Sequence, residues 1–191
     1  MELGNMDNVN VCKELVITIY NNMDASHDYQ HIERVYKNAE TILQSEPQAD
    51  VQIVRLAVLL HDVSDAKYTQ TKEAEERILQ KLDLTDEQRQ HIRDIIASVS
   101  FNGGNELQAK TIEAKIVRDA DRLDAIGAVG IARTFAYGGA KGRKLYDDAE
   151  EARAQMSVEE YRTKSTASVT HFYEKLLLLK DLMVTEKGKQ M

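Results

Sequence analysis

Two histidines and two aspartates of this chain have the side chains of a metal site. His31, the adjacent pair His61 and Asp62, and Asp121 can each give a lone pair to a divalent cation. Two imidazoles and two carboxylates make a mixed nitrogen and oxygen set, which suits a six-coordinate Mn, Fe, Ni, Co or Mg ion better than a closed structural zinc. These residues therefore predict one divalent metal ion as the cofactor, with open positions for water and substrate.

Helices must position these side chains, because the chain is patterned as helical almost throughout. Pro47 is the single proline, and nine glycines leave long stretches unbroken. Apolar residues recur at spacings of three and four after His31, and the segment before His61 is apolar on nearly all sides, which indicates a central buried helix. The predicted helices cover residues 11–23, 31–44, 49–63, 72–82, 111–135 (interrupted near the glycines at 127 and 130) and 150–174 with an extension to about 188; another begins after Thr85 as its N-cap, and 137–148 is a loop.

One ion would therefore join three helices. His61 and Asp62 end the buried helix, where adjacent side chains can both turn toward one point. His31 must approach from a second helix and Asp121 from a third. A lone histidine at a helix start is more often a cap or a surface residue, so the metal hypothesis depends on all four residues acting together.

Length and composition bound the class of protein. The 191 residues fit a single domain, 1–191, with a core of about 11–185. The formal charge of −7 comes from interspersed acids and bases without a basic stripe, so no nucleic-acid partner is expected. Cys12 is the single cysteine, and neither a secretory signal nor a membrane-spanning apolar run is visible, so we expect a cytoplasmic protein that does not enter a membrane. A homodimer remains open.

The order of these residues resembles the H…HD…D signature of the HD superfamily of metal-dependent phosphohydrolases. Four stretches of the chain resemble one branch of this superfamily, the small stand-alone bacterial HD proteins. These stretches are residues 26–35, 59–63, 119–128 and 171–177. An HD dipeptide alone is a weak signal, whereas four stretches in order are specific. The resemblance implies an all-α helical bundle in which His31, His61, Asp62 and Asp121 bind the metal. Relatives of this branch run on through a further C-terminal helix, which we expect this chain to lack.

The resemblance also implies roles close to the HD dipeptide. In related alarmone hydrolases an acidic residue at the position of Asp65 is thought to help activate the water. Asp65 is therefore the predicted catalytic base, with a helix-capping role as the alternative. The alarmone pattern has a second acid next, where this chain has Ala66, and this departure argues against alarmone specificity. Lys67 closely follows the dipeptide and is the first candidate for contacting phosphate in catalysis.

Further residues could line the pocket or support the ligands. His27 and Asp28 form a second HD dipeptide, but the family pattern carries the ligand role to His31; His27 then lines the pocket, orients a ligand or simply enters the helix. Asp124 lies one turn after Asp121 and is expected to face the same way, toward a ligand or a substrate hydroxyl. Arg122, Arg133 and Lys175 are candidate phosphate contacts or solvated charges, and Tyr29, Tyr68 and Phe101 could stack on a base.

The resemblance implies metal-dependent phosphohydrolysis of a small-molecule nucleotide. The leading reaction cleaves a nucleoside triphosphate to monophosphate and pyrophosphate. A nucleotide phosphomonoesterase, similar to a 5′-nucleotidase, could use an overlapping pocket, and the sequence does not separate the two reactions. A non-catalytic HD signalling module is a further alternative. The presence of all four ligand residues argues against it.

Overall fold

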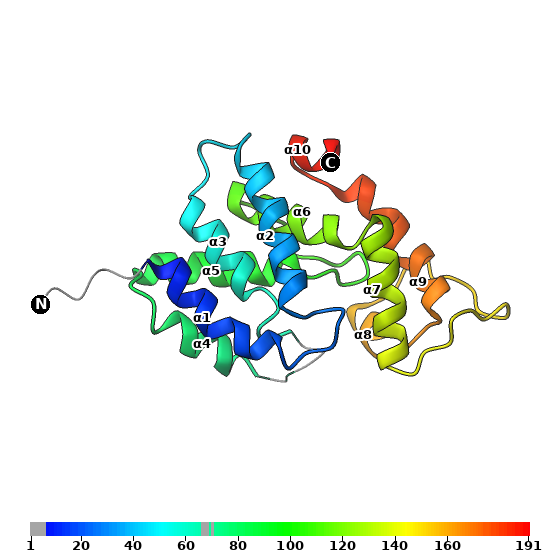
Figure 1. Cartoon of the computed structure of the whole chain (residues 1–191). Coiled ribbons are helices and arrows are strands. Elements are labelled where there is room, and N and C mark those ends of the chain that lie inside the picture. Colours follow the sequence, from blue (N-terminus) through cyan, green and yellow to red (C-terminus); the bar gives the residue numbers. More distant parts are fainter. Residues whose placement is uncertain (1–6, 66–68, 70) are drawn as a thin grey trace, which may run out of the picture.

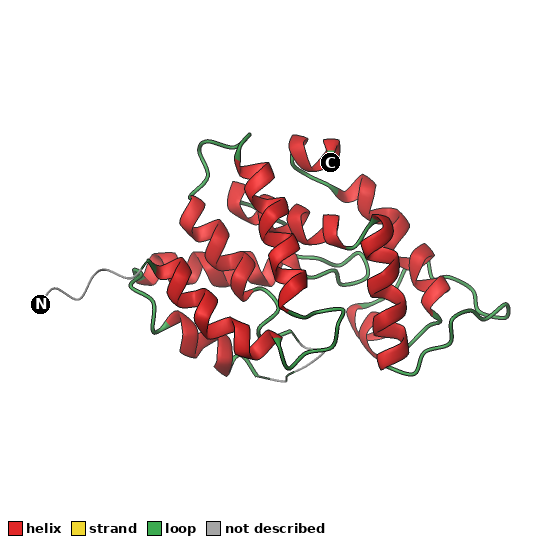
Figure 2. Ribbon diagram, in the orientation of Figure 1, coloured by secondary structure: helices red, strands yellow, loops and turns green. Residues whose placement is uncertain are grey.

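Helices make up all the regular structure in the part of the chain that the computed structural model describes, which is residues 7–65, 69 and 71–191 (Figure 2). The predicted all-α class is confirmed. The elements are α1 (Asn8–Tyr20), α2 (Tyr29–Leu43), α3 (Val51–Leu60), α4 (Glu73–Leu79), α5 (Asp86–Val99), α6 (Ile112–Asp124), α7 (Gly127–Ala140), α8 (Val158–Thr163), α9 (Ser168–Glu174), the 3-10 helix η1 (Leu176–Leu182) and α10 (Glu186–Gln190).

Helix α3 lies at the centre of a bundle. It packs against α1, α2, α5 and α6, and α2 also packs against α6 (Figure 1). Every residue of α3 from Ile53 to Leu60 is buried except Arg55. A helix that is apolar on all sides has no face to give to solvent, so its neighbours must surround it. The prediction of a buried central helix is confirmed, and its C-terminal end delivers the HD dipeptide into the interior.

The chain breaks between α6 and α7 at the glycines where the sequence predicted an interruption. Gly127 has φ +65°, a left-handed conformation that glycine adopts without steric cost. A Cβ at Gly130 would lie 2.3 Å from the carbonyl oxygen of Ala125, so only glycine fits so close to the preceding turn. The break lets α7 leave the bundle and pack against α9 (Figure 1).

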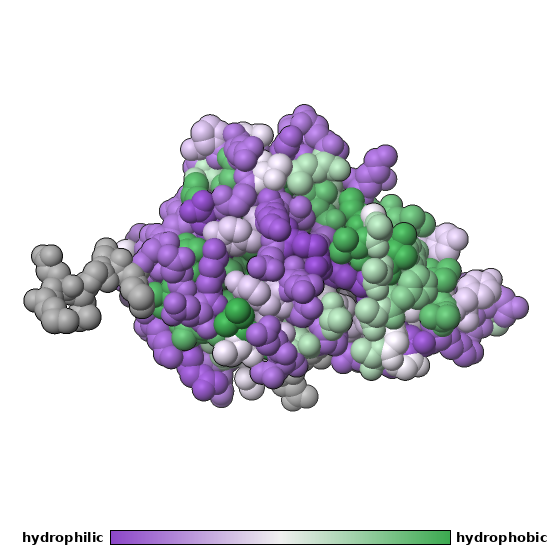
Figure 3. All heavy atoms as spheres, in the orientation of Figure 1, coloured by the Kyte–Doolittle hydropathy of each residue, from purple (hydrophilic) through white to green (hydrophobic). Residues whose placement is uncertain are grey.

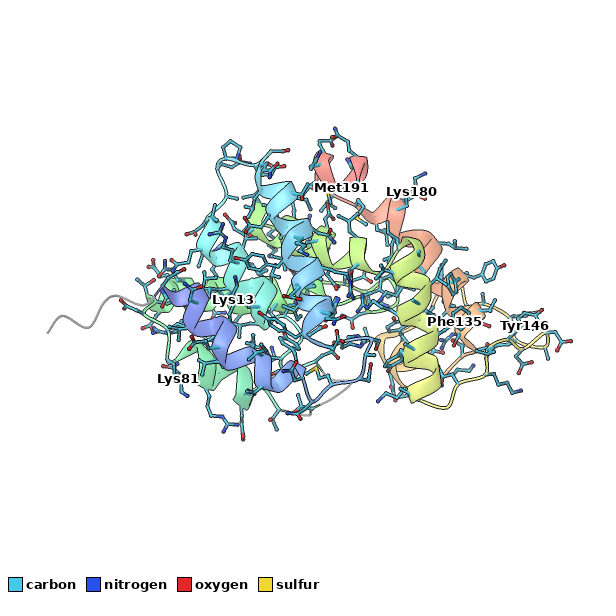
Figure 4. The ribbon with its side chains drawn as sticks, viewed as in Figure 1. Lys13, Lys81, Phe135, Tyr146, Lys180 and Met191 are labelled. Atoms are coloured by element: carbon cyan, nitrogen blue, oxygen red, sulfur yellow. The ribbon has the colours of Figure 1, made fainter. Side chains whose placement is uncertain are left out.

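The region after α7 differs from the prediction. Helix α7 runs on to Ala140, inside the predicted loop, and residues 150–157 are irregular where a helix was predicted. Tertiary contacts override the helical propensity there: Arg153 donates to buried Glu174 at 2.7 and 2.9 Å, and Glu150 accepts a backbone N–H at 2.8 Å. Tyr146 projects into solvent from the irregular segment that follows α7 (Figure 4).

Asp119 fastens the C-terminal segment to α6. Its fully buried carboxylate accepts the backbone N–H of Val184 at 3.0 Å and of Thr185 at 2.7 Å, together with the Thr185 hydroxyl at 2.7 Å. A Cβ at Gly188 would lie 2.6 Å from the same carboxylate. A buried carboxylate needs such donors, so this segment supports the helix that carries Asp121.

The surface has two different characters on the face shown in Figure 3. Hydrophobic residues gather over α7 and the adjoining C-terminal segment, whereas the bundle is largely hydrophilic there. Ile131, Leu177 and Leu178 are among the exposed apolar side chains.

No helix within the described ranges combines the length and apolar character needed to cross a membrane. The homodimer stays a prediction.

Candidate metal centre and adjoining cavity

The four predicted ligand side chains converge inside the bundle, from α2, the end of α3 and α6. Nε2 of His31 lies 3.4 Å from a carboxylate oxygen of Asp62 and 3.6 Å from one of Asp121. Nε2 of His61 lies 3.6 and 3.7 Å from the same two oxygens. Two atoms that bind one ion at about 2.1 Å can be no more than about 4.2 Å apart, so these separations fit a shared cation.

Both imidazoles present a free nitrogen toward this point. Nδ1 of His61 lies 2.8 Å from the carbonyl oxygen of Val58, and Nδ1 of His31 lies 2.7 Å from Asp124. Because these acceptors require a proton on Nδ1, the Nε2 lone pairs face the centre. Both Nε2 atoms are buried, and neither has a hydrogen-bond partner among the described residues. Orphaned nitrogens between two carboxylates are what a divalent ion requires, so the residues fit the predicted cofactor.

Asp124 holds His31 in this orientation and is itself held by two arginines. Arg34 donates to its carboxylate at 2.6 and 3.1 Å, and Arg133 approaches it at 3.0 Å. Arg133 also donates to the backbone carbonyls of Ser26 and Asp124. Burial raises the pKa of Asp124, but its bonds to His31 and Arg34 outweigh burial and hold it below its usual range. Asp124 therefore stays ionised and accepts a hydrogen bond from Nδ1 of His31.

The second HD dipeptide has a structural role in part. Asp28 is the N-cap of α2, and its side chain accepts the backbone N–H of His31 at 3.1 Å. His27 bonds through Nδ1 to Ser26 at 2.7 Å, lines the adjoining cavity and packs edge-on against His31. The dipeptide thus begins the helix that presents His31, while His27 remains beside the metal centre.

The charges of the centre favour a bound cation. Burial lowers the pKa of His61, but the carboxylates of Asp62 and Asp121 raise it to about 9. Burial raises the pKa of Asp62 and of Asp121, yet the nearby histidines bring both well below their usual range. A proton and a metal ion compete for the same imidazole nitrogens, so a site that attracts protons this strongly also attracts a divalent ion.

A cavity of about 460 Å³ adjoins the centre and is rich in cations. Asp62, Asp65 and Asp121 line it on the metal side. The lysines and arginines of its wall, among the described residues, are Arg133, Lys141, Arg143, Arg153, Lys164 and Lys175. Arg133 and Arg153 pair with Asp124 and Glu174, so the positive charge of this wall comes mainly from the other four cations. On a chain of formal charge −7, a wall with this charge suits a polyanion.

The remaining predicted residues separate into two groups. His27, Asp65, Phe101, Arg133 and Lys175 line the cavity. Arg122 lies outside it: the side chain is buried and donates to the backbone carbonyl of Leu182 at 2.5 Å. Tyr29 contacts Tyr20 instead, and Lys67 and Tyr68 fall outside the described residues.

Several wall residues were not singled out from the sequence. Tyr137 and Arg143 come from the end of α7 and the segment after it, and Arg153 and Tyr161 come from farther along the chain. The glycines at 138, 139 and 142 with neighbouring bases were a signal for the first two. Arg153 had no such signal, because its position depends on its pairing with Glu174.

Comparison with known proteins gives the family. The HD domain model matches residues 28–126, slightly more than half of the chain. The chain belongs to the HD-domain family. YpgQ of Bacillus subtilis is 37% identical over 182 residues, which cover 92% of this chain and 80% of that protein.

Solved structures agree with this family. This chain matches the crystal structure of a Lactobacillus plantarum protein with a TM-score of 0.89 at 31% identity. The match covers 97% of this chain and 88% of the other. An HD-superfamily hydrolase of Bacillus thuringiensis matches at 39% identity with a TM-score of 0.68, over 95% and 85% of the two chains. YpgQ in complex with ADP matches at 31% identity with a TM-score of 0.67, over 94% and 86%. The protein is an HD-superfamily hydrolase with a His/Asp metal-binding cluster.

Proposed function

We propose that this hydrolase cleaves nucleoside triphosphates to monophosphates and pyrophosphate, with one divalent ion held by His31, His61, Asp62 and Asp121. The observation that carries the proposal is the shared cavity, in which carboxylates of the metal cluster and six lysines and arginines of the described chain face the same space. A metal centre alone would serve many hydrolases, whereas cations around it favour an anionic substrate such as a phosphate ester. The ADP bound by YpgQ supports a nucleotide.

The chemistry divides between the ion and the protein. When bound, the ion supplies Lewis-acid assistance, lowering the pKa of water and offsetting phosphate charge. Asp65 accepts the proton of the attacking water as that oxygen forms its bond to the α-phosphorus. The bond from the α-phosphorus to the bridging oxygen breaks, and its electron pair leaves with pyrophosphate. One water is consumed for each monophosphate and pyrophosphate formed.

Aromatic side chains of the wall give a surface for the base. The Phe101 and Tyr161 rings contact each other edge-on at 5.3 Å, and the Tyr161 and His171 rings stack at 6.4 Å. All three line the cavity. Flat rings bind any nucleobase by stacking, so this wall favours nucleotides over free polyphosphate without selecting one base.

A nucleotide panel tests the reaction. The protein is treated with chelator, reloaded with Mn, Mg, Co or Ni, and given mono-, di- and triphosphates while phosphate and pyrophosphate are both measured. We expect triphosphates to yield monophosphate and pyrophosphate in equal amounts. Release of phosphate from monophosphates, with no pyrophosphate from triphosphates, would establish the phosphomonoesterase instead. His91→Ala is a matched control for His61→Ala, because His91 bonds to Thr111, away from the cluster.

A further inference from the structure

A row of side chains leads along the cavity wall from the metal cluster to Arg143. The ring of His31 lies 5.9 Å from that of His27, which lies 5.8 Å from that of Tyr137. The guanidinium of Arg143 lies over Tyr137, 5.1 Å from the ring centre. The rings of His27 and Tyr137 thus lie between Arg143 and the metal cluster. A phosphate group bound at Arg143 would therefore be a different group of the ligand from the one bound at the metal.

Among the residues that the structure describes, Arg143 is the arginine of the cavity wall that has no counter-ion. Arg133 pairs with Asp124 and Arg153 pairs with Glu174, so both are largely neutralised. Within the described residues Arg143 forms no ion pair, and its buried Nε has no hydrogen-bond partner. Leaving a buried donor unsatisfied is costly, and an anionic ligand would relieve that cost.

A second unsatisfied donor lies beside Arg143. Ser168 is 1% exposed and lines the same cavity, and its hydroxyl has no hydrogen-bond partner in the part of the chain that the structure describes. Its backbone N–H bonds to the carbonyl of Lys144 at 2.9 Å, which ties it to the Arg143 segment. A Cβ at Gly138 would lie 2.2 Å from the Ser168 oxygen, so a glycine is needed for this close approach.

We propose that Arg143, assisted by Ser168, binds the phosphates beyond the one that is attacked, and so holds the pyrophosphate leaving group. The assignment rests on the proposed function. A guanidinium stacked on an aromatic ring keeps its N–H edge free, and its planar fork matches two phosphate oxygens. Arg143 is then a specificity residue: it favours di- and triphosphates over monophosphates, while the metal cluster binds the phosphate common to all of them.

Calorimetric binding tests this assignment without turnover. The metal-loaded protein is titrated with inorganic orthophosphate and pyrophosphate, in wild type, Arg143→Gln and a matched control, Lys144→Gln. Lys144 is an exposed neighbour whose side chain pairs with Asp147. Loss of charge-assisted bonds should raise the Kd for pyrophosphate about tenfold to hundredfold in Arg143→Gln, and leave orthophosphate within about twofold. Lys144→Gln should bind both anions as wild type does.

A second variant covers the case in which Arg143→Gln does not fold. Arg143→Lys keeps the charge but loses the planar fork, and should weaken pyrophosphate binding selectively by about threefold to tenfold. Equal weakening of both anions in these variants, or no change in either, would overturn the assignment. The product panel on wild type is read separately: absence of pyrophosphate from triphosphates refutes the proposed reaction, whatever the calorimetry gives.

Discussion

Asp124 is not a predicted metal ligand, but it holds the ligand His31 in place. The variant Asp124→Asn therefore tests how much this support contributes to stability and to metal binding. The carboxylate accepts from His31 at 2.7 Å and pairs with Arg34 and Arg133, and its side chain is 3% exposed. An amide of the same shape cannot offset both arginines, and its NH₂ group opposes their donors. Breaking a buried charge pair by changing one partner typically costs about 3 kcal/mol or more. In a protein of this size, that cost lowers Tm by about 6–12 °C.

The same substitution should weaken metal binding about tenfold to hundredfold, because the His31 imidazole loses the charged acceptor that orients it. Metal affinity is measured by competition with a chromophoric chelator, and Tm is measured with the metal removed. Glu40→Gln is the matched control: Glu40 also binds an arginine through two oxygens, with Arg55 at 2.7 and 3.0 Å, but the pair is more than a third exposed. Its loss should cost about 1 kcal/mol or less and leave metal affinity unchanged. Wild-type metal affinity in folded Asp124→Asn would refute the reasoning.

Other predictions concern single residues. His61→Ala should lose the metal and all activity, whereas His27→Ala should keep the metal, as elemental analysis will show; the reverse result would mean that the ligands are misassigned. Asp65→Asn should keep its metal but lose about a hundredfold or more in kcat, and an unchanged kcat would exclude it as the base. Burial raises the pKa of Cys12 to about 12. Because the folded protein binds the thiol proton more tightly than the unfolded chain does, the protonated thiol favours the folded state. This stabilisation is fully present below the pKa of the unfolded thiol, about 8.5, and is lost as the pH rises toward 12. Iodoacetamide at pH 8 should label Cys12 only after unfolding.

Local signals in the sequence predicted much of the bundle. Thr85 begins α5 with a capping box, in which its hydroxyl accepts the N–H of Gln88 and the Gln88 side chain accepts that of Thr85. The continuous apolar run before His61 gave the central helix, because no other placement buries all of its faces. The break at Gly127 was visible since glycine is favoured where φ is positive. These features depend on residues within a few positions of one another.

The parts that were missed depend on distant contacts. Residues 150–157 have the composition of a helix, yet Arg153 is held by Glu174, 21 positions away, and the helix does not form. Likewise, Arg143 faces the cavity because the segment beyond α7 bonds to the start of α9. The candidate metal ligands could be singled out despite their wide spacing, because their types and order resemble a known signature. No such signature marks Arg143 or Arg153, whose positions in the wall depend on contacts between distant segments.

The anchoring of Asp119 has a consequence for the order in which the protein is made. Its carboxylate obtains its donors from Thr185, 66 positions later in the chain. During synthesis, α6 is therefore present for several seconds, at roughly 5–20 residues per second, with a charged group that nothing yet satisfies. A carboxylate in that state stays in water, which opposes early burial of the helix carrying Asp121. We therefore expect the metal centre to assemble only after Thr185 has left the ribosome.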